Sequence, residues 1–145
     1  MNNTYFYEVN LKWDSLTNGT LSAKVETNKI EVDTQPEFPK GVREKWTPEH
    51  LFVVAVNTCL MSTFLLVADN SKFQFISFDS HAIGKIEKLD GKMVVTEIVL
   101  KPKLVIPSTQ NETKAKRVLE MSENACVIAN SNKTKIISEP IITTK

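Results

Sequence analysis

The sequence predicts one α+β domain over residues 1–145, in which strands and helices occupy separate stretches of the chain. Three observations lead to this prediction. Residues 46–70 form a long apolar stretch that carries the start and stop signals of a helix. Short alternating segments precede it, and a strong hairpin signal, a second helical pattern and a final apolar segment follow it. This order does not favour the alternating strands and helices of a parallel βαβ sheet.

The N-terminal third predicts a three-stranded antiparallel meander. Residues 5–13, 21–25 and 30–32 alternate between apolar and polar side chains, as half-buried strands do. Asn18-Gly19 suits the positive φ angles of a turn between the first two strands. Residues 35–45 contain two prolines and a glycine, which are typical of a surface loop.

The long apolar stretch begins and ends like a helix. Thr47 can cap the free amide groups, Pro48 suits the first helical position, and Glu49 places negative charge in the first turn. Asp69-Asn70 supplies a stop signal. About 22 residues at ~1.5 Å per residue make a rod of roughly 33 Å, the width of a small domain.

This central helix is apolar on most sides, because residues 51–56 and 64–68 leave no continuous polar face. A membrane span has the same length. Four polar residues near its middle argue against a span: Asn57, Thr58, Ser62 and Thr63. We therefore expect a buried central helix in a protein that does not enter the membrane.

The chain after this helix predicts a hairpin. Residues 73–87 are rich in aromatic and β-branched side chains, and Gly84 is a candidate for a bulge. Asp90-Gly91 is the strongest hairpin signal in the chain. The partner strand over residues 93–106 contains Pro102, which we expect near an edge or a bend.

A second helix and a last strand complete the predicted domain. Thr109 followed by Glu112 has the form of a capping box. Apolar and small residues then recur at helical spacing as far as Cys126. Residues 136–142 are apolar enough to form a final strand.

Composition is that of an ordinary soluble protein. The net charge is +1 and hydrophobic residues make up 41% of the chain, with no basic block that would favour nucleic acid. The first residues lack the pattern of a secretory signal. Two cysteines do not make a secreted disulfide framework, so we expect a reducing cytoplasm.

Cys59 and Cys126 are the candidate reactive groups, although free cysteines often only fill space in a core. They are 67 residues apart, and the chain has two histidines, so neither their spacing nor the available ligands favour a metal site. A reactive cysteine needs a cation or a helix N-terminus to stabilise its thiolate. Cys59 lies in the middle of the predicted helix, so the cation has to come from elsewhere.

The spacing of Glu49 and Cys59 predicts a dimer if both serve one site. They are ten residues apart, which is ~15 Å along a helix axis and on different faces. An antiparallel second copy of the helix would supply one of them, and it would also cover a helix that is apolar on most sides. Both arguments favour an isologous homodimer.

Two segments resemble a known family. Residues 47–52 (Thr-Pro-Glu-His-Leu-Phe) lead to Cys59-Leu-Met, and residues 123–131 read Glu-Asn-Ala-Cys-Val-Ile-Ala-Asn-Ser. This pattern resembles the OsmC/Ohr family of osmotically inducible and organic-hydroperoxide-resistance proteins, over nearly the whole chain. The family commonly has Pro-Tyr or Pro-Val after the second cysteine, where this chain has Val127-Ile128.

The resemblance implies a thiol peroxidase and an OsmC-like fold. Cys59 would attack the outer oxygen of an organic hydroperoxide and become a sulfenic acid, and Cys126 would be the resolving thiol that forms a disulfide with it. A lipoyl or other dithiol would then reduce the disulfide, with no bound cofactor. Glu49 matches the glutamate that holds an arginine over the reactive thiol. The family also implies an intertwined homodimer with its sites at the interface.

This chain departs from the family pattern at that arginine. The peroxidases have it just before the Asn-Gly-like pair in the turn after the first strand, where this chain has Thr17. The two arginines are Arg43 and Arg117, and Arg43, in the loop before the central helix, is our candidate for the catalytic cation. Lys40 and Lys45 are alternatives that lack a bidentate grip on a carboxylate.

Two other functions therefore stay open: a non-peroxidatic member of the family that binds a small apolar ligand, and a structural dimer with inert thiols. Without a nearby cation, a thiol pKa near ~8.5 would leave only a few per cent of thiolate at neutral pH.

Overall fold

The computed structural model describes residues 4–23, 26–34 and 45–145 and confirms a mixed α+β architecture. The chain separates into two compact units, Met1–Leu51 and Phe52–Lys145. The loop residue Arg43, our candidate cation, lies outside the described residues.

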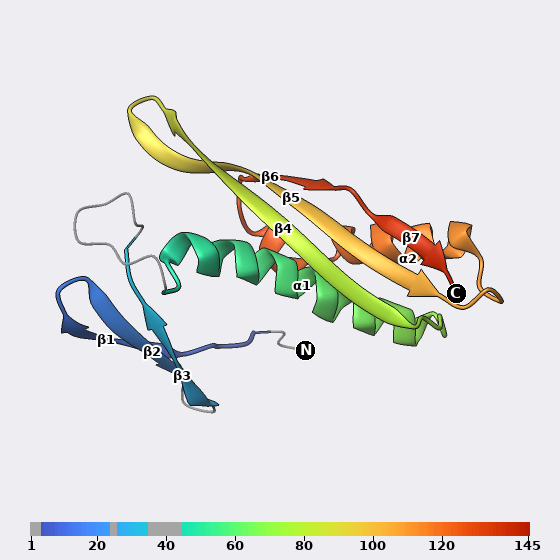
Figure 1. Ribbon diagram of the computed structural model, residues 1–145, viewed down its shortest axis with the longest axis horizontal. Coiled ribbons are helices and arrows are strands. Elements are labelled where there is room, and N and C mark those ends of the chain that lie inside the picture. The colour runs from blue at the N-terminus through green and yellow to red at the C-terminus, as the bar shows by residue number, and fades with distance from the viewer. Residues whose placement is uncertain (1–3, 24–25, 35–44) are drawn as a thin grey trace. The chain divides into compact units, whose positions relative to one another are not determined.

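The first unit contains the predicted three-stranded meander. Strands β1 (Val9–Ser15), β2 (Asn18–Ala23) and β3 (Glu26–Val32) pair antiparallel in chain order, as Figure 1 shows. The position of the first turn differs from the prediction. The residue with positive φ is Leu16 (φ 50°) rather than Asn18 or Gly19, because Ser15 pairs directly with Asn18. The indole Nε1 of Trp13 donates to the carbonyl of Leu16 at 3.0 Å and closes this turn.

Helix α1 (Pro48–Asn70) begins where the sequence predicted. The hydroxyl of Thr47 accepts from the N–H of His50 at 3.3 Å, and the N–H of Thr47 donates back to Nδ1 of His50 at 3.2 Å. This reciprocal pair is a capping box in which histidine takes the place of glutamate. Helix α1 ends at Asn70, and Lys72 just beyond it adopts positive φ (53°).

The prediction that α1 is covered on most sides is wrong for the single chain. The buried residues follow one line at spacing four: Val56, Leu60, Phe64 and Ala68. Val54, Met61 and Leu65 form a second line, which is exposed, and Leu66 beside it keeps 61% of its surface. Among the described residues, α1 is the one helix with the length and hydropathy of a membrane span, a test that core helices of soluble proteins also pass.

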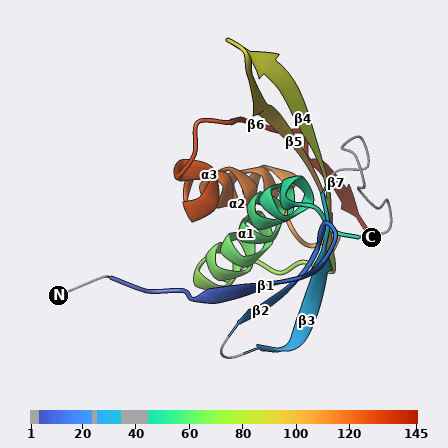
Figure 2. The ribbon, with the colours of Figure 1, turned by 90° about the vertical axis from the view of Figure 1, so that its left-hand side faces the viewer.

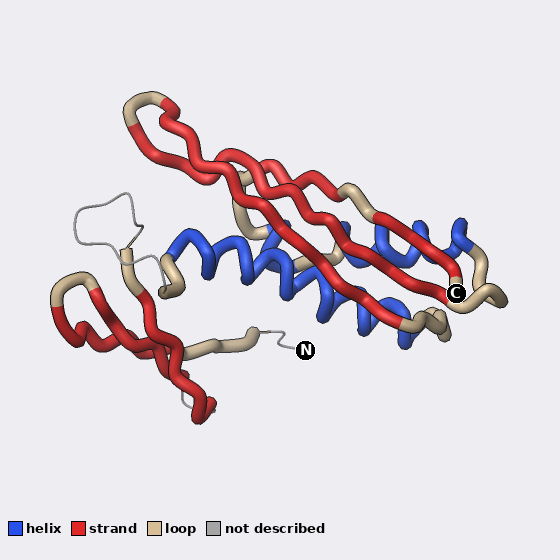
Figure 3. The backbone as a smooth tube through the Cα atoms, viewed as in Figure 1, coloured by secondary structure: helices blue, strands red, loops and turns tan. Residues whose placement is uncertain are grey.

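The second unit is a sheet with helices on one face. Strands β4 (Ser77–Leu89) and β5 (Lys92–Ile106) form the predicted long antiparallel hairpin, and Asp90 and Gly91 take the positive φ angles of its turn. Strands β6 (Lys135–Ser138) and β7 (Ile141–Thr144) both pair parallel with β5. Figures 2 and 3 show the helices of this unit on the same side of this sheet.

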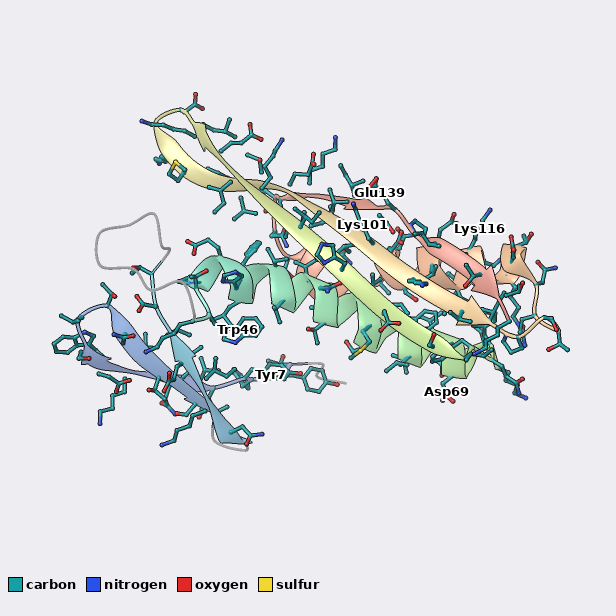
Figure 4. The ribbon with its side chains drawn as sticks, in the orientation of Figure 1. Tyr7, Trp46, Asp69, Lys101, Lys116 and Glu139 are labelled. Atoms are coloured by element: carbon teal, nitrogen blue, oxygen red, sulfur yellow. The ribbon has the colours of Figure 1, made fainter. Side chains whose placement is uncertain are left out.

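Two buried clusters fix α1 to this sheet. One joins Phe64 and Ala68 to β5 and to helix α2 (Glu112–Asn124), and the other joins Val56 and Leu60 to Ile98 and Leu100 of β5. Strand β5 alternates strictly here, so that even-numbered residues from 98 to 106 are buried. Lys101, labelled in Figure 4, belongs to the opposite set and is exposed. Each fully buried leucine or phenylalanine contributes roughly 1.5–3 kcal/mol of folding free energy.

Pro102 is buried within β5, and the sheet is interrupted beside it. Even-numbered carbonyls of β5 face the β6–β7 side, since Leu100 accepts from Glu139 at 2.8 Å and Ile106 from Lys145 at 3.0 Å. The nitrogen of Pro102 faces the same side and has no hydrogen to donate. The sequence predicted one last strand, but the structure has two. Pairing with β5 stops after Ser138 and resumes at Ile141.

Gly84 has a packing role and does not form a bulge. The register shift lies one residue later, between Lys85 and Ile86. A Cβ atom at position 84 would stand 2.5 Å from Cγ2 of Val53 on α1. The missing side chain therefore lets the helix approach the sheet.

The second helical segment is two helices, with Cys126 between them. Helix α2 (Glu112–Asn124) begins at Asn111, whose side chain accepts from the N–H of Thr113 at 2.7 Å. The predicted capping residue, Thr109, is not the N-cap. Helix α3 (Val127–Asn130) follows after Ala125, and Cys126 is its N-cap.

Candidate functional site

The fold of the second unit brings the two cysteines together. Cys59 lies in the middle of α1, and Cys126 lies at the junction of α2 and α3. Both thiols are free. Cys59 is half-buried, whereas Cys126 keeps 2% of its surface. The two thiols are neighbours, and each affects the pKa of the other.

Polar groups around Cys59 lower the pKa of its thiol. Partial burial raises the pKa of the Cys59 thiol, but four donors outweigh it: the N–H of Ile128, the thiol of Cys126, the hydroxyl of Thr63 and the N–H of Val127. The pKa of Cys59 is therefore held below its ordinary value. The Thr63 hydroxyl lies 3.9 Å from Sγ of Cys59, one helical turn away.

These backbone donors are available because they begin a helix. The first N–H groups of a helix have no carbonyl partner within it, and the carbonyl of Cys126 accepts only from the fourth residue on, Asn130, at 3.0 Å. Sequence reasoning sought a cation for Cys59 and missed these groups. The sequence signal that could have revealed them is Asn124-Ala125, where α2 ends, so that a new helix can begin after Cys126.

The environment of Cys126 has the opposite effect. Burial raises the pKa of the Cys126 thiol, and the hydrogen bond and negative charge of Cys59 raise it further, against the N–H groups of Ala129 and Ile128. Cys59 is therefore the more acidic of the two thiols. This pairing suits a nucleophilic thiolate with a neutral thiol next to it.

The other predicted site residues belong to the first unit. Glu49 lies in the first turn of α1, and its Oε2 is buried without a hydrogen-bond partner among the described residues. The alternative cation Lys45 donates to Oδ1 of Asn18 at 2.6 Å and lies 3.6 Å from Oε2 of Glu31. Lys45 is thus engaged within the meander.

Thr17, at the position of the family arginine, has a structural partner. Its hydroxyl donates to Oδ1 of Asp33 at 2.5 Å, and the N–H of Thr34 donates to the same oxygen at 2.7 Å. The hydrogen bond from Thr17 holds the pKa of the buried Asp33 carboxyl below its ordinary value. In this chain the turn therefore contributes a hydroxyl to a buried aspartate of its own sheet.

A pocket of about 240 Å³ lies beside Cys126. Leu60, Leu100, Ala129 and Ile136 form its apolar wall, and the polar lining comes from Glu123, Asn124, Asn130 and Ser138. The hydroxyl of Ser138, on β6, donates to Oε1 of Glu123 at 2.5 Å. Among the described residues, no three His, Cys, Asp or Glu side chains are grouped as a metal site would require.

Comparison with known proteins gives a family match. Residues 39–139 match the family model for OsmC-like protein. An OsmC-like protein of unknown function from Vibrio cholerae has a similar structure, with a TM-score of 0.86 and 24% identity over 95% of this chain and 100% of that one. No curated protein matches the sequence.

Other solved structures share the fold at lower identity. An organic hydroperoxide resistance protein from Elizabethkingia anophelis aligns with a TM-score of 0.75 and 20% identity over the whole of both chains. An OsmC-like protein from Mycoplasma pneumoniae aligns with a TM-score of 0.80 and 16% identity, over 96% of this chain and 98% of that one.

Proposed function

The chain belongs to the family of OsmC-like proteins, and we propose that it is a thiol peroxidase that reduces organic hydroperoxides. The observation that carries this proposal is the pairing of Cys59 and Cys126 at the start of α3, where the pKa of Cys59 is lowered and that of Cys126 is raised. Solved relatives that are called organic hydroperoxide resistance proteins share the fold.

The first step uses the thiolate of Cys59. Its sulfur attacks the outer oxygen of the hydroperoxide, the O–O bond breaks, and the alkoxide leaves and takes a proton as the alcohol. Cys59 becomes a sulfenic acid. The N–H groups of Val127 and Ile128 favour this step because they lower the pKa of Cys59 and so increase the share of its thiolate form.

The second step uses Cys126. Its sulfur attacks the sulfenic sulfur of Cys59, a disulfide forms and water leaves. A dithiol of the lipoyl type then reduces the disulfide by exchange. Both sulfurs belong to one compact unit, so the disulfide needs no residue from another chain. We place this cycle in the cytoplasm, where thiols are kept reduced.

The test is oxidation of a dithiol driven by an organic hydroperoxide. We expect turnover with the wild type, none with Cys59→Ser, and a single sulfenic acid without recycling in Cys126→Ser. Equal turnover in wild type and Cys59→Ser would reject the proposal, and so would an absence of turnover in the wild type.

One observation favours a second function. Thr17 is committed to Asp33, and the described residues place no arginine beside Cys59. A non-peroxidatic family member that binds a small apolar ligand, or a structural dimer with inert thiols, fits this absence. Slow alkylation of both native cysteines at neutral pH would favour the inert form over the peroxidase.

We also propose that the protein is a homodimer. Val54, Met61 and Leu65 form an exposed apolar line on α1, and Leu66 is exposed beside it. Apolar residues of β1 are exposed as well, with Trp13 keeping 71% of its surface. Soluble monomers rarely expose apolar patches of this kind. A second copy of the chain would cover both surfaces and could offer a partner to the unpaired Oε2 of Glu49.

A further inference from the structure

The pocket lies beside Cys126, the thiol that does not attack the hydroperoxide in the proposed cycle. Of the two cysteines, Cys126 lines it and Cys59 does not. Its volume of about 240 Å³ is just below the roughly 300–1,000 Å³ of drug-sized ligand pockets. It would hold a small molecule or the end of a longer chain.

Cys59 lies outside the lining of the pocket. It is half-buried on α1, next to Thr58 and one turn from Ser62, and both of these residues are exposed. Neither of them lines the pocket. The pocket therefore leads to Cys126 rather than to Cys59.

We propose that the reductant reaches the disulfide through this pocket and attacks the sulfur of Cys126, and that Glu123 makes the pocket select neutral or cationic thiols over anionic ones. This inference rests on the proposed function, because it concerns the step that regenerates the two thiols.

A dithiol reductant regenerates the two protein thiols in two successive exchanges. Its first thiolate attacks Sγ of Cys126, a mixed disulfide forms, the bond to Cys59 breaks, and Cys59 leaves as a thiolate. The second thiol, after losing its proton, attacks the reductant sulfur of the mixed disulfide, and Cys126 leaves and is protonated. The dithiol loses two electrons and two protons and becomes a disulfide, while the two protein sulfurs gain the electrons.

The direction of attack agrees with the chemistry of the leaving group. A thiolate of lower pKa leaves faster in disulfide exchange. The hydrogen bonds from Ile128, Thr63 and Val127 lower the pKa of Cys59 against the opposing effect of burial, whereas burial raises that of Cys126. Attack on Cys126 releases Cys59, the better leaving group, and returns it as the thiolate that the next cycle needs.

The charge of the pocket determines which thiols it admits. Glu123 is the one charged residue among those that line it, and the hydroxyl of Ser138 holds its carboxyl group at the wall. The remaining polar lining, Asn124 and Asn130, is neutral. An anionic thiol would meet the charge of Glu123 without a compensating cation from the lining, whereas a cationic thiol would be attracted.

The site of attack can be mapped on protein oxidised with diamide, which forms the disulfide without any peroxidase activity. The oxidised wild type is mixed briefly with 2-mercaptoethanol, quenched with acid and N-ethylmaleimide, and digested with trypsin. The two cysteines fall in separate peptides, residues 46–72 and 118–133. We expect the first mercaptoethanol adduct on peptide 118–133 and the alkylated free thiol on peptide 46–72.

The charge preference is tested with three small thiols: cysteamine (cationic), 2-mercaptoethanol (neutral) and 3-mercaptopropionate (anionic). We expect Glu123→Gln to lower the ratio of the cysteamine rate to the mercaptopropionate rate by about three- to tenfold at low salt. Glutamine can still accept from Ser138. The matched control is Glu120→Gln, which removes the same charge from an exposed position on α2 outside the pocket, and it should leave the ratio unchanged.

The outcomes separate this inference from the proposed function. If diamide does not join the two peptides, the two-cysteine cycle itself is wrong. If it joins them but the first adduct lies on Cys59, the pocket is not the route of the reductant. Equal rate ratios in Glu123→Gln and wild type would overturn the assigned role of Glu123.

Discussion

The contact between Gly84 and Val53 gives a quantitative test of how α1 is seated on the sheet. In Gly84→Ala the new Cβ would stand 2.5 Å from Cγ2 of Val53, whereas carbon atoms pack at about 3.5–4.0 Å. The helix must therefore retreat by about 1 Å, since a β-branched side chain in a helix has one strongly preferred rotamer. Overpacking of this kind costs about 1–3 kcal/mol of unfolding free energy.

The sign of the effect should depend on Val53. Gly84 does not have a positive φ angle, so alanine fits its backbone and would by itself stabilise the fold by about 0.4–1 kcal/mol through the unfolded chain. In a Val53→Ala background the clash is gone. We therefore expect Gly84→Ala to be destabilising with Val53 present and neutral or stabilising without it, a coupling of at least ~1 kcal/mol.

The assay is urea unfolding followed by far-UV circular dichroism at one fixed protein concentration. Both tryptophans, Trp13 and Trp46, lie in the Met1–Leu51 unit, so their fluorescence would not report on this contact. The control is Gly91→Ala, where φ is +80° and no atom lies within 4 Å of the new Cβ, and its cost should be the same in both backgrounds. Equal effects of Gly84→Ala with and without Val53 would refute the reasoning.

Three further predictions follow from the site and its supports. In the reduced protein, the alkylation rate of Cys59 should rise at a lower pH than that of Cys126, because the pKa of Cys59 is lowered and that of Cys126 is raised. Mass spectrometry of the two tryptic peptides measures both rates. The reverse order would contradict the roles assigned to the two cysteines. Asn111→Ala should cost about 1 kcal/mol of unfolding free energy through loss of the N-cap, whereas Thr109→Ala should be near neutral; equal urea midpoints would place the cap elsewhere. Leu65→Glu, on the exposed apolar line of α1, should convert a homodimer into monomers in light scattering, and an unchanged mass would show that this face is not the interface.

Much of the fold was predictable because its signals are local. The hairpin turn at Asp90-Gly91 and the start of α1 at Thr47 depend on backbone angles and caps that a few neighbouring residues determine. Two local signals led to errors. Asn111 rather than Thr109 caps α2, and Pro102 lies inside β5, where its missing N–H divides the last strand into β6 and β7.

The candidate site was predictable only in part. The two cysteines were identified from their helical settings and from the family resemblance. The groups that lower the pKa of Cys59 were not identified. Every residue except proline has a backbone N–H, so the residue types of Val127 and Ile128 do not reveal this role. The pocket beside Cys126 combines residues from α1, β5, β6, α2 and α3, and no spacing in the sequence relates them.

The sequence by itself determined the main elements, their order, and the two thiols that could do chemistry. Only the tertiary structure decided that the first N–H groups of α3 lower the pKa of Cys59 and that Cys126 is the more buried and less acidic partner. The physical reason is that propensities and caps act over a few residues of chain. The ionisation of a thiol depends instead on every dipole within a few ångströms, whichever segment supplies it.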